Sequence, residues 1–361
     1  MRHPGAGHAL AVPPSSAPTR RPRVRRSDPS GPGWRLRRRG RGFELLDQRG
    51  RRIRGTEHRD RVRALAIPPA WKDVWVCPDP QGHVQATGTD AAGRRQYRYH
   101  PDHVARRSRA KFDCTARFAR SLPDLRARVD ADIAGDDRDE ATVLACVVRL
   151  LDRGFFRVGT ETYAAKNRTF GLTTLEKRHV QIAHDDVLVF DYTAKHGRRR
   201  VQNVVDARAA EIVGTLRRRR SGGDRLFAHR DATGWHPVRA EAVNAYIREA
   251  TGLDDVSAKA FRTWNATVLA AVAVSIAEPA AGTSRRAQER VMKRAADEVA
   301  RYLGNTPAVC RSSYIDPRVF DRWTAGETVA EAVLDLAALP DPGVLATHGS
   351  IEAAVLDLLG G

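Results

Sequence analysis

The segment Lys259-Ala260-Phe261-Arg262-Thr263-Trp264-Asn265-Ala266-Thr267 opens a helix that the sequence predicts over residues 260–277. It carries a lysine and an arginine in the spacing Lys259-x-x-Arg262 within an otherwise largely apolar helix. Helical periodicity continues on both sides of it from about residue 103 onward, so the segment lies in a large, mainly helical region. The helices predicted there span 103–121, 123–134, 139–153, 206–219, 239–250, 260–277, 284–303 and 327–337, with a last one near 350–359.

One β-hairpin interrupts the helices. The runs 187–192 and 201–205 are rich in β-branched and aromatic residues, and they flank a turn at Ala194-Lys195-His196-Gly197. The tip of this hairpin is basic and carries Lys195.

The part before residue 105 has a different pattern. Short β-like runs at 42–46, 73–77 and 83–88 are separated by turn formers, with a short helix near 57–65. Residues 1–33 contain seven prolines, four glycines and six arginines, which predicts a disordered basic tail. The predicted fold class is α+β: a tail (1–33), a small, mainly antiparallel β domain (34–105) and a larger, mainly helical domain with a small β-hairpin sheet (106–361).

The charge of the chain points to a polyanionic partner. The 361 residues include 62 lysines and arginines against 43 aspartates and glutamates, a formal net charge of +19, and only seven of the basic residues are lysines. Guanidinium forks bind pairs of phosphate oxygens, so nucleic acid is the predicted partner. A genome biased toward arginine would explain the arginine-to-lysine ratio, but it would not explain the excess of positive charge. A membrane surface fits less well, because no strongly amphipathic basic helix with bulky apolar anchors stands out and no apolar run of 18 residues could span a bilayer.

The cysteines and the N-terminus favour an intracellular protein. Cys77, Cys114, Cys146 and Cys310 are too widely spaced for a zinc site, so reduced thiols are predicted. No apolar stretch of a secretory leader is visible. We expect a cytoplasmic protein associated with the nucleoid.

Familiar motifs for phosphate chemistry are missing from the sequence. It contains no GxxxxGK[ST] loop, no HExxH motif and no GxSxG elbow, and the acidic run 130–140 fits a solvated loop better than a magnesium site. A protein that cuts phosphodiesters without these motifs needs a side-chain nucleophile and cationic stabilisers of the transition state. Residues suited to that route occur in the hairpin tip and in the segments 155–159 with 171–175, 259–267, 303–307 and 311–315.

These segments closely resemble the catalytic blocks of type IB DNA topoisomerases. The runs FRVG and GLTTL, then KAFRTWNAT, then GNTP followed by RSSY occur in the family's order, and Tyr314 lies nine residues after Asn305. The resemblance covers roughly residues 40–330 and is to the compact bacterial and poxvirus branch. Tyrosine recombinases share the catalytic fold, but they usually have His-x-x-Arg where this chain has Lys259-x-x-Arg262, and their N-terminal domain is typically helical.

The resemblance implies a role for each of five residues, listed at the end of this paragraph. The tyrosine would attack the scissile phosphate and form a 3′-phosphotyrosine, and the two arginines would bind the non-bridging oxygens. The lysine would protonate the 5′-oxygen, although a solvated turn lysine is the plain alternative. The asparagine could donate one hydrogen bond to phosphate where many relatives have histidine, and it also fits a helix C-cap turn. The catalytic residues so predicted are Arg157, Lys195, Arg262, Asn305 and Tyr314.

A second set of residues is implied to touch DNA. The run Gly93–Tyr99 resembles the DNA-facing stretch of the small poxvirus-like members, and alternation along a strand would place both of its tyrosines on one face. A half-buried aromatic pair is the alternative. Ala260 stands where some relatives have aspartate, so no carboxylate contact is expected at this position. The predicted DNA-binding residues are Arg95, Gln96, Tyr97, Tyr99 and Lys259.

Together these features predict a type IB DNA topoisomerase: a monomeric clamp on duplex DNA that nicks, swivels and religates. No cofactor, no metal and no obligate protein partner is expected, and no membrane contact. Two alternatives stay open at this point: a strand transferase of the tyrosine recombinase kind, and an inactive DNA-binding protein of the same fold.

Overall fold

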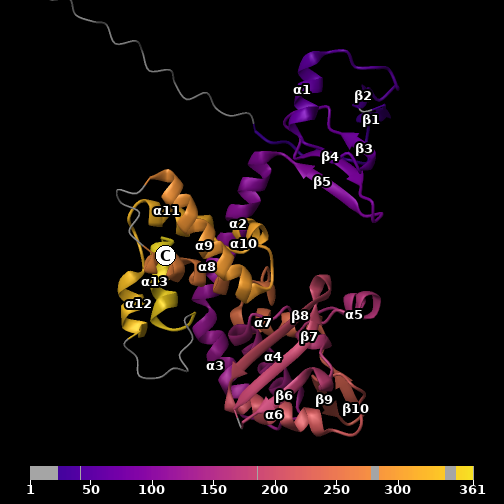
Figure 1. The fold of residues 1–361 in the computed structure, drawn as a ribbon. Helices are drawn as coiled ribbons and strands as arrows, with labels where there is room; N and C mark the ends of the chain where they lie inside the picture. Colours follow the sequence, from indigo (N-terminus) through magenta and orange to yellow (C-terminus); the bar gives the residue numbers. More distant parts are fainter. Residues whose placement is uncertain (1–22, 41, 185, 278–283, 338–346, 361) are drawn as a thin grey trace, which may run out of the picture. The chain divides into compact units, whose positions relative to one another are not determined.

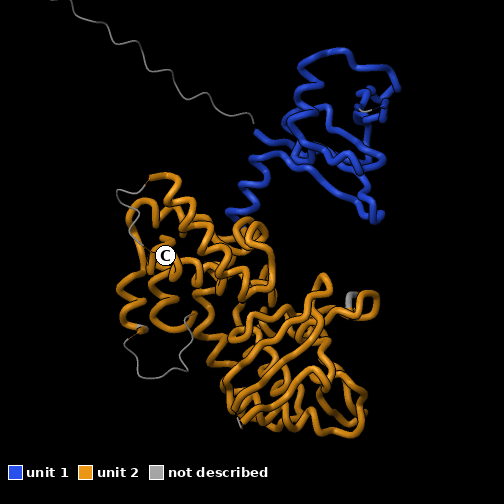
Figure 2. Tube along the Cα trace, viewed as in Figure 1, with its two compact units in different colours: residues 1–110 blue, residues 111–361 orange. Residues whose placement is uncertain are grey.

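The computed structural model describes residues 23–40, 42–184, 186–277, 284–337 and 347–360. Most of the predicted tail, residues 1–22, lies outside these ranges. The chain divides into two compact units, residues 1–110 and 111–361 (Figure 2). Within the described ranges, every helix is too short or too polar to cross a lipid bilayer.

The first unit is built on one antiparallel sheet of five strands in the order β2-β1-β3-β4-β5 (Figure 1). Helix α1 packs its buried Val62 against the apolar face of the sheet, where Leu45, Val74, Val76 and Ala86 form a small core. The predicted antiparallel β domain is therefore confirmed. Its elements are β1 (Trp34–Arg39), β2 (Gly42–Leu46), α1 (Thr56–Ala64), β3 (Lys72–Val76), β4 (Val84–Thr89) and β5 (Arg95–Tyr99).

Residues 23–33 differ from the prediction of a disordered tail, because they are ordered against this sheet. The backbone N–H of His83 donates to the carbonyl of Arg25 at 2.8 Å. The hydroxyl of Ser27 donates to the carbonyl of Val84 and accepts its N–H, both at 3.0 Å. Composition misled the prediction, since these contacts use backbone groups and one small side chain rather than large apolar residues.

The second unit is mainly helical, as predicted. Helix α2 (Pro101–Arg120) continues from the first unit into the second, so both the division at 110/111 and the boundary predicted at 105/106 lie within it. The central helices α4 and α8 supply much of the large core, including the fully buried Trp264. The other helices of this unit are α3 (Leu122–Asp132), α4 (Glu140–Gly154), α5 (Glu161–Asn167), α6 (Ala207–Arg218), α7 (Ala240–Thr251), α8 (Lys259–Ile276), α9 (Arg285–Leu303), α10 (Pro307–Ser313), α11 (Pro317–Thr324), α12 (Ala330–Ala337) and α13 (Ser350–Leu358).

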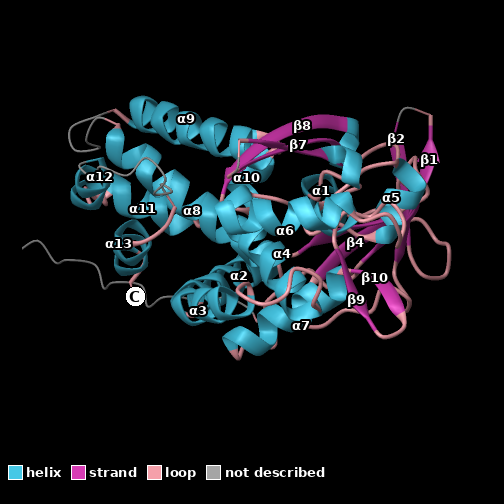
Figure 3. Ribbon diagram, turned by 90° about the horizontal axis from the view of Figure 1, so that it is seen from below, coloured by secondary structure: helices cyan, strands magenta, loops and turns pink. Residues whose placement is uncertain are grey.

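Two small antiparallel sheets complete the unit. The predicted hairpin is present and longer than expected: β7 (Val187–Ala194) and β8 (Arg198–Val205) lie side by side (Figure 3). Strand β6 (Val180–Ala183) pairs with the other edge of β7. Strands β9 (Ala228–Asp231) and β10 (Gly234–Pro237) form a second hairpin that the sequence did not predict. Short 3₁₀ turns lie at Leu172–Thr174, Lys177–His179 and Lys195–Gly197.

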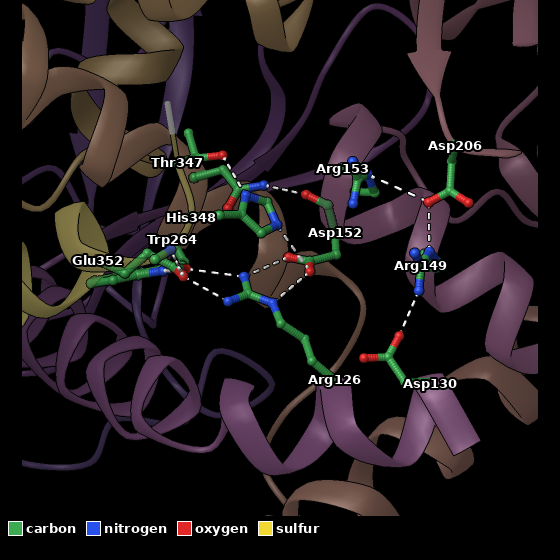
Figure 4. A network of polar contacts seen from close by, with 12 residues as sticks. Arg126, Asp130, Arg149, Asp152, Arg153, Asp206, Trp264, Thr347, His348 and Glu352 are labelled. Atoms are coloured by element: carbon green, nitrogen blue, oxygen red, sulfur yellow. Dashed lines mark hydrogen bonds and ion pairs between the residues drawn. The ribbon is translucent and has the colours of Figure 1, made fainter. Parts of the chain in front are cut away.

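A buried polar network attaches the last helix to the core (Figure 4). Arg126 of α3 donates to Asp152 of α4 at 2.8 Å and to Glu352 of α13 at 2.6 Å. Asp152 also contacts His348 at 3.1 Å, and the indole of Trp264 donates to Glu352 at 2.8 Å. The C-terminal segment is thus bonded to three helices of the core.

Candidate active site

Arg157 lies in the loop after α4, and a second stretch of backbone holds that loop. The N–H of Leu172 donates to the carbonyl of Arg157 at 2.8 Å. Two glycines allow the approach, because a Cβ on Gly171 would lie 2.5 Å from the Cα of Gly159, which itself has a φ of +94°. The FRVG and GLTTL segments therefore come together to fix the backbone of Arg157.

Arg262 stands in the first turn of α8 and is buried, with 3% of its surface exposed. Its Nη2 donates to the carbonyl of Leu303 at 2.8 Å, and its Nη1 donates to the carbonyl of Phe155. The Nε atom is buried and has no hydrogen-bond partner among the described residues. Burial and the charge of the neighbouring Arg157 lower the pKa of this guanidinium. A bound anion would therefore stabilise the charged form of Arg262.

Asn305 is hydrogen-bonded to Arg157. It follows Gly304, which ends α9 with a left-handed φ of +61°. The Asn305 amide oxygen accepts a hydrogen bond from Arg157 Nη2. Its amide nitrogen is buried and has no hydrogen-bond partner among the described residues, and Asn305 is not among the residues that line the cavity described below.

Tyr314 directly follows α10, and its ring lies beside two cations. The guanidinium carbon of Arg262 is 5.4 Å from the ring centroid and the Nζ of Lys259 is 5.7 Å from it. Burial alone would raise the pKa of the phenol, but the charges of Arg262 and Lys259 outweigh it and lower the pKa below the ordinary 10.0. A lowered pKa makes the phenol a better nucleophile near neutral pH.

Lys195 stands at the tip of the β7–β8 hairpin and lines the same cavity as the other cations. The cavity has a volume of about 250 Å³. Four cationic side chains and no carboxylate occur among the residues that line it, which suits a phosphate group. Its lining residues are Arg157, Val158, Gly159, Thr160, Thr169, Phe170, Gly171, Lys195, Ala258, Lys259, Arg262 and Tyr314.

The structure also places residues near the site that sequence reasoning missed. Arg200 on β8 donates to the carbonyl of Tyr302 and, at 2.6 Å, to the side chain of Gln202. Its charge contributes to lowering the pKa of Arg262. Strand alternation places Arg200 on the same face as the buried Val204, which separates it from Arg199 but not from Arg198.

The remaining candidates belong to the first unit and lie on β5. Tyr97 and Tyr99 are 45% and 36% exposed and stack with their ring centroids 5.8 Å apart, so they share one face as predicted. Arg95 donates to the hydroxyl of Thr87 at 2.9 Å. The Gln96 amide donates to Asp90 at 2.8 Å, on the other side of the strand.

A wide groove lies over the tyrosine pair. Its volume is about 1350 Å³, and three arginines line it against one aspartate, whose carboxylate accepts hydrogen bonds from Ser30. The ordered segment before β1 forms one wall of this groove. The lining residues are Arg26, Ser27, Asp28, Pro29, Ser30, His83, Val84, Arg95, Tyr97, Tyr99, His103 and Arg107.

Comparison with known proteins agrees with this architecture. The family model described as the catalytic core of eukaryotic DNA topoisomerase I matches residues 101–326, and the model of the N-terminal domain of bacterial DNA topoisomerase IB matches residues 42–90. These matches confirm the resemblance and the α+β fold class predicted from the sequence.

Individual relatives point the same way. DNA topoisomerase 1B of Acanthamoeba polyphaga mimivirus is 31% identical over 266 residues, which cover 72% of this chain and 78% of the viral protein. DNA topoisomerase 1B of vaccinia virus (strain Copenhagen) is 28% identical over 102 residues, covering 28% of this chain and 32% of the viral protein. DNA topoisomerase 1 of Daucus carota is 26% identical over 163 residues, covering 45% of this chain and 19% of the plant protein. The chain belongs to the family of type IB DNA topoisomerases.

Proposed function

We propose that this protein relaxes supercoiled duplex DNA by cutting one strand through Tyr314, letting the free end rotate, and rejoining the strand. The observation that carries the proposal is the position of the Tyr314 ring beside Lys259 and Arg262, in a cavity lined by cations. Such a site favours a phenolate nucleophile and the growing negative charge of a pentacoordinate phosphate at the same time.

In the cleavage step the phenolate oxygen of Tyr314 attacks the scissile phosphorus, and the bond from phosphorus to the 5′-oxygen breaks. Arg157 and Arg262 bind the non-bridging oxygens. Backbone carbonyls and Asn305 accept hydrogen bonds from these guanidiniums, and such contacts hold the cations in place before the substrate arrives. The Asn305 amide nitrogen would donate to one of the same oxygens if the side chain turned toward the bound phosphate.

Lys195 would act as the general acid. Its ammonium transfers a proton to the departing 5′-oxygen, so the products are a 3′-phosphotyrosyl enzyme and a 5′-hydroxyl strand end. Arginine could not take this part, because its pKa is about 13. Religation is the reverse of these steps, and the phosphotyrosyl ester conserves the energy of the phosphodiester, so ATP is not required.

We further propose that the stacked tyrosines and arginines of the first unit bind the same duplex, so that the two units close around DNA as a monomeric clamp. No obligate protein partner is required by this scheme, and the cytoplasmic nucleoid is the expected place of action. The groove over Tyr97 and Tyr99 supports the DNA contact, since aromatic faces and arginines suit sugars, bases and phosphates.

The decisive experiment is relaxation of a supercoiled plasmid without ATP or magnesium, comparing the wild type with Tyr314→Phe. The variant should lose relaxation and keep non-covalent affinity for duplex DNA, because only the attacking oxygen is removed. Denaturant trapping on labelled DNA should give a 3′-linked adduct with the wild type alone. An adduct that persists in Tyr314→Phe would show that another residue is the nucleophile.

A further inference from the structure

A lysine from α2 is bonded to the residue that precedes the nucleophile. The Nζ of Lys111 donates to the carbonyl oxygen of Ser313 at 3.0 Å. Ser313 is the last residue of α10, and Tyr314 follows it directly. The final carbonyls of a helix lack partners within the helix and carry its negative end, so an ammonium is a suitable donor there.

The next carbonyl is contacted from a different helix. The hydroxyl of Thr267 on α8 lies 3.3 Å from the carbonyl oxygen of Tyr314, and it also accepts the N–H of Asp316 at 3.1 Å. A hydroxyl has one hydrogen, and the carbonyl of Thr263 lies closer to it, at 2.9 Å. Lys111 therefore provides the stronger of the two side-chain restraints on the backbone around Tyr314.

Lys111 occupies an unfavourable place for a cation. It is half-buried, and burial together with the charge of Lys259 lowers its pKa to about 8, while Asp316 opposes the shift. The charged neighbours on the surrounding elements are Lys259 of α8, Asp316 at the start of α11, and Arg318, which pairs with both Asp316 and Asp113.

We infer that Lys111 is a positioning residue for the nucleophile: its ammonium fixes the Ser313 carbonyl and thereby orients the Tyr314 phenol toward the phosphate held by Arg157 and Arg262. The inference rests on the proposed function. In-line attack requires the phenolate oxygen at the phosphorus in a narrow range of angles, and a displacement of about 1 Å can cost roughly 100-fold in rate. A restraint on the residue before Tyr314 acts directly on that geometry.

The test is single-turnover cleavage of a suicide duplex at saturating enzyme by Lys111→Met, Lys111→Arg and the wild type. Lys293→Ala, an exposed lysine on α9 outside the cavity, is the matched control. Lys111→Met should cleave about 10- to 100-fold more slowly, with unchanged duplex affinity and unchanged salt dependence of binding. Lys111→Arg should recover most of the rate, because it restores a cationic donor, and thermal unfolding confirms that each variant is folded.

The pH profile supplies a readout that a purely structural lysine would not give. Between about pH 7 and pH 9 the ratio of the wild-type rate to the Lys111→Arg rate should fall, because only the lysine loses its charge in that range. All other titratable groups of the site are the same in both proteins, so their contributions cancel in the ratio.

Three outcomes would overturn the inference. Lys111→Met could cleave as fast as the wild type, or the rate ratio could stay constant with pH. Alternatively, the loss could lie in duplex affinity, with the slope of log affinity against log salt smaller by about 0.9, which would make Lys111 a phosphate contact. Each of these leaves the wild-type adduct intact, whereas a wild type that forms no adduct contradicts the proposed function itself.

Discussion

Glu352 in the C-terminal helix α13 accepts the indole N–H of Trp264, 2.8 Å away, and Trp264 lies two residues beyond Arg262 on α8. The same carboxylate accepts from Arg126, which also binds Asp152 near the end of α4. Arg262 stands on α8 and Arg157 lies in the loop that follows α4. The Asn265 amide joins these two helices directly by donating to the Asp152 carbonyl at 2.9 Å. The last helix therefore stabilises the part of the core on which the arginine pair depends.

Replacing Glu352 should destabilise the protein strongly. Glu352→Ala removes one of the two carboxylates bound to Arg126, which keeps Asp152, and leaves the buried Trp264 indole without its acceptor, which should cost about 1–3 kcal/mol in the free energy of unfolding. Glu352→Gln keeps an acceptor and should lose less. Chemical denaturation measures both, with Glu331→Ala on the exposed face of α12 as a control that should change stability by less than about 0.5 kcal/mol. Equal losses for Glu352→Ala and Glu331→Ala would contradict the structural role of α13.

The same network predicts a specific loss of stability in acid. Burial by itself would raise the pKa of the Asp152 carboxyl, but His348 and Arg126 lower it to about 2, below the ordinary 3.8. Because the folded pKa is depressed, Asp152 contributes stability above about pH 4, and that contribution is lost as the pH falls toward 2. Asp152→Asn should thus be less stable than the wild type at neutral pH, and the difference should shrink between about pH 4 and pH 2. A difference that stays constant over this range would mean that Asp152 is not held ionised by its neighbours.

Sequence reasoning reached most of the fold and the centre of the site, for reasons that particular elements make clear. Helix α8 was predicted over 260–277 and spans 259–276. The prediction succeeded because a long helix that packs in the core has a clear pattern of apolar residues. Helix α10 has only seven residues, and its start is defined by the N-cap Thr306 and the proline that follows it. Such a short helix has too little periodicity to be recognised from the sequence. The bond from Lys111 to Ser313 joins residues 202 positions apart, and nothing in the local pattern of either residue indicates it.

The general-acid role of Lys195 predicts a chemical rescue. Lys195→Ala should slow cleavage by roughly 10²- to 10⁴-fold, the usual contribution of a general acid. A substrate with sulfur at the 5′-bridging position has a leaving group that needs no proton, so it should restore the rate of the variant. Lys195→Arg should behave like the alanine variant on the normal substrate, since a guanidinium does not release its proton near neutral pH. Lys293→Ala serves as the control and should cleave at the wild-type rate. If the sulfur substrate fails to restore cleavage by Lys195→Ala, Lys195 is not the general acid.

The salt dependence of DNA binding tests the groove in the first unit. Each phosphate that the protein neutralises releases about 0.9 counterion, so on the order of six to ten contacts should weaken binding about 10³- to 10⁵-fold between roughly 50 and 200 mM salt. Arg26 lines the groove over Tyr97 and is held there by the bonds of Ser27 to the start of β4. Arg26→Ala should therefore reduce the slope of log affinity against log salt by about 0.9 on any duplex sequence.

Two further variants test whether the change in slope comes from Arg26 in the groove. Arg49→Ala changes an exposed arginine of the same unit that does not line the groove, and it should leave the slope unchanged. Deleting residues 1–22 keeps the ordered segment from residue 23 onward. If residues 1–22 make only weak contacts with phosphates, the deletion should lower the slope only modestly. The deletion could instead lower the slope by about 0.9 while Arg26→Ala leaves it unchanged. In that case the phosphate contact belongs to residues 1–22 and not to the groove. A nearly flat salt dependence of the full-length chain would instead contradict a DNA clamp of any form, because a surface with a formal charge of +19 cannot bind many phosphates without releasing their counterions.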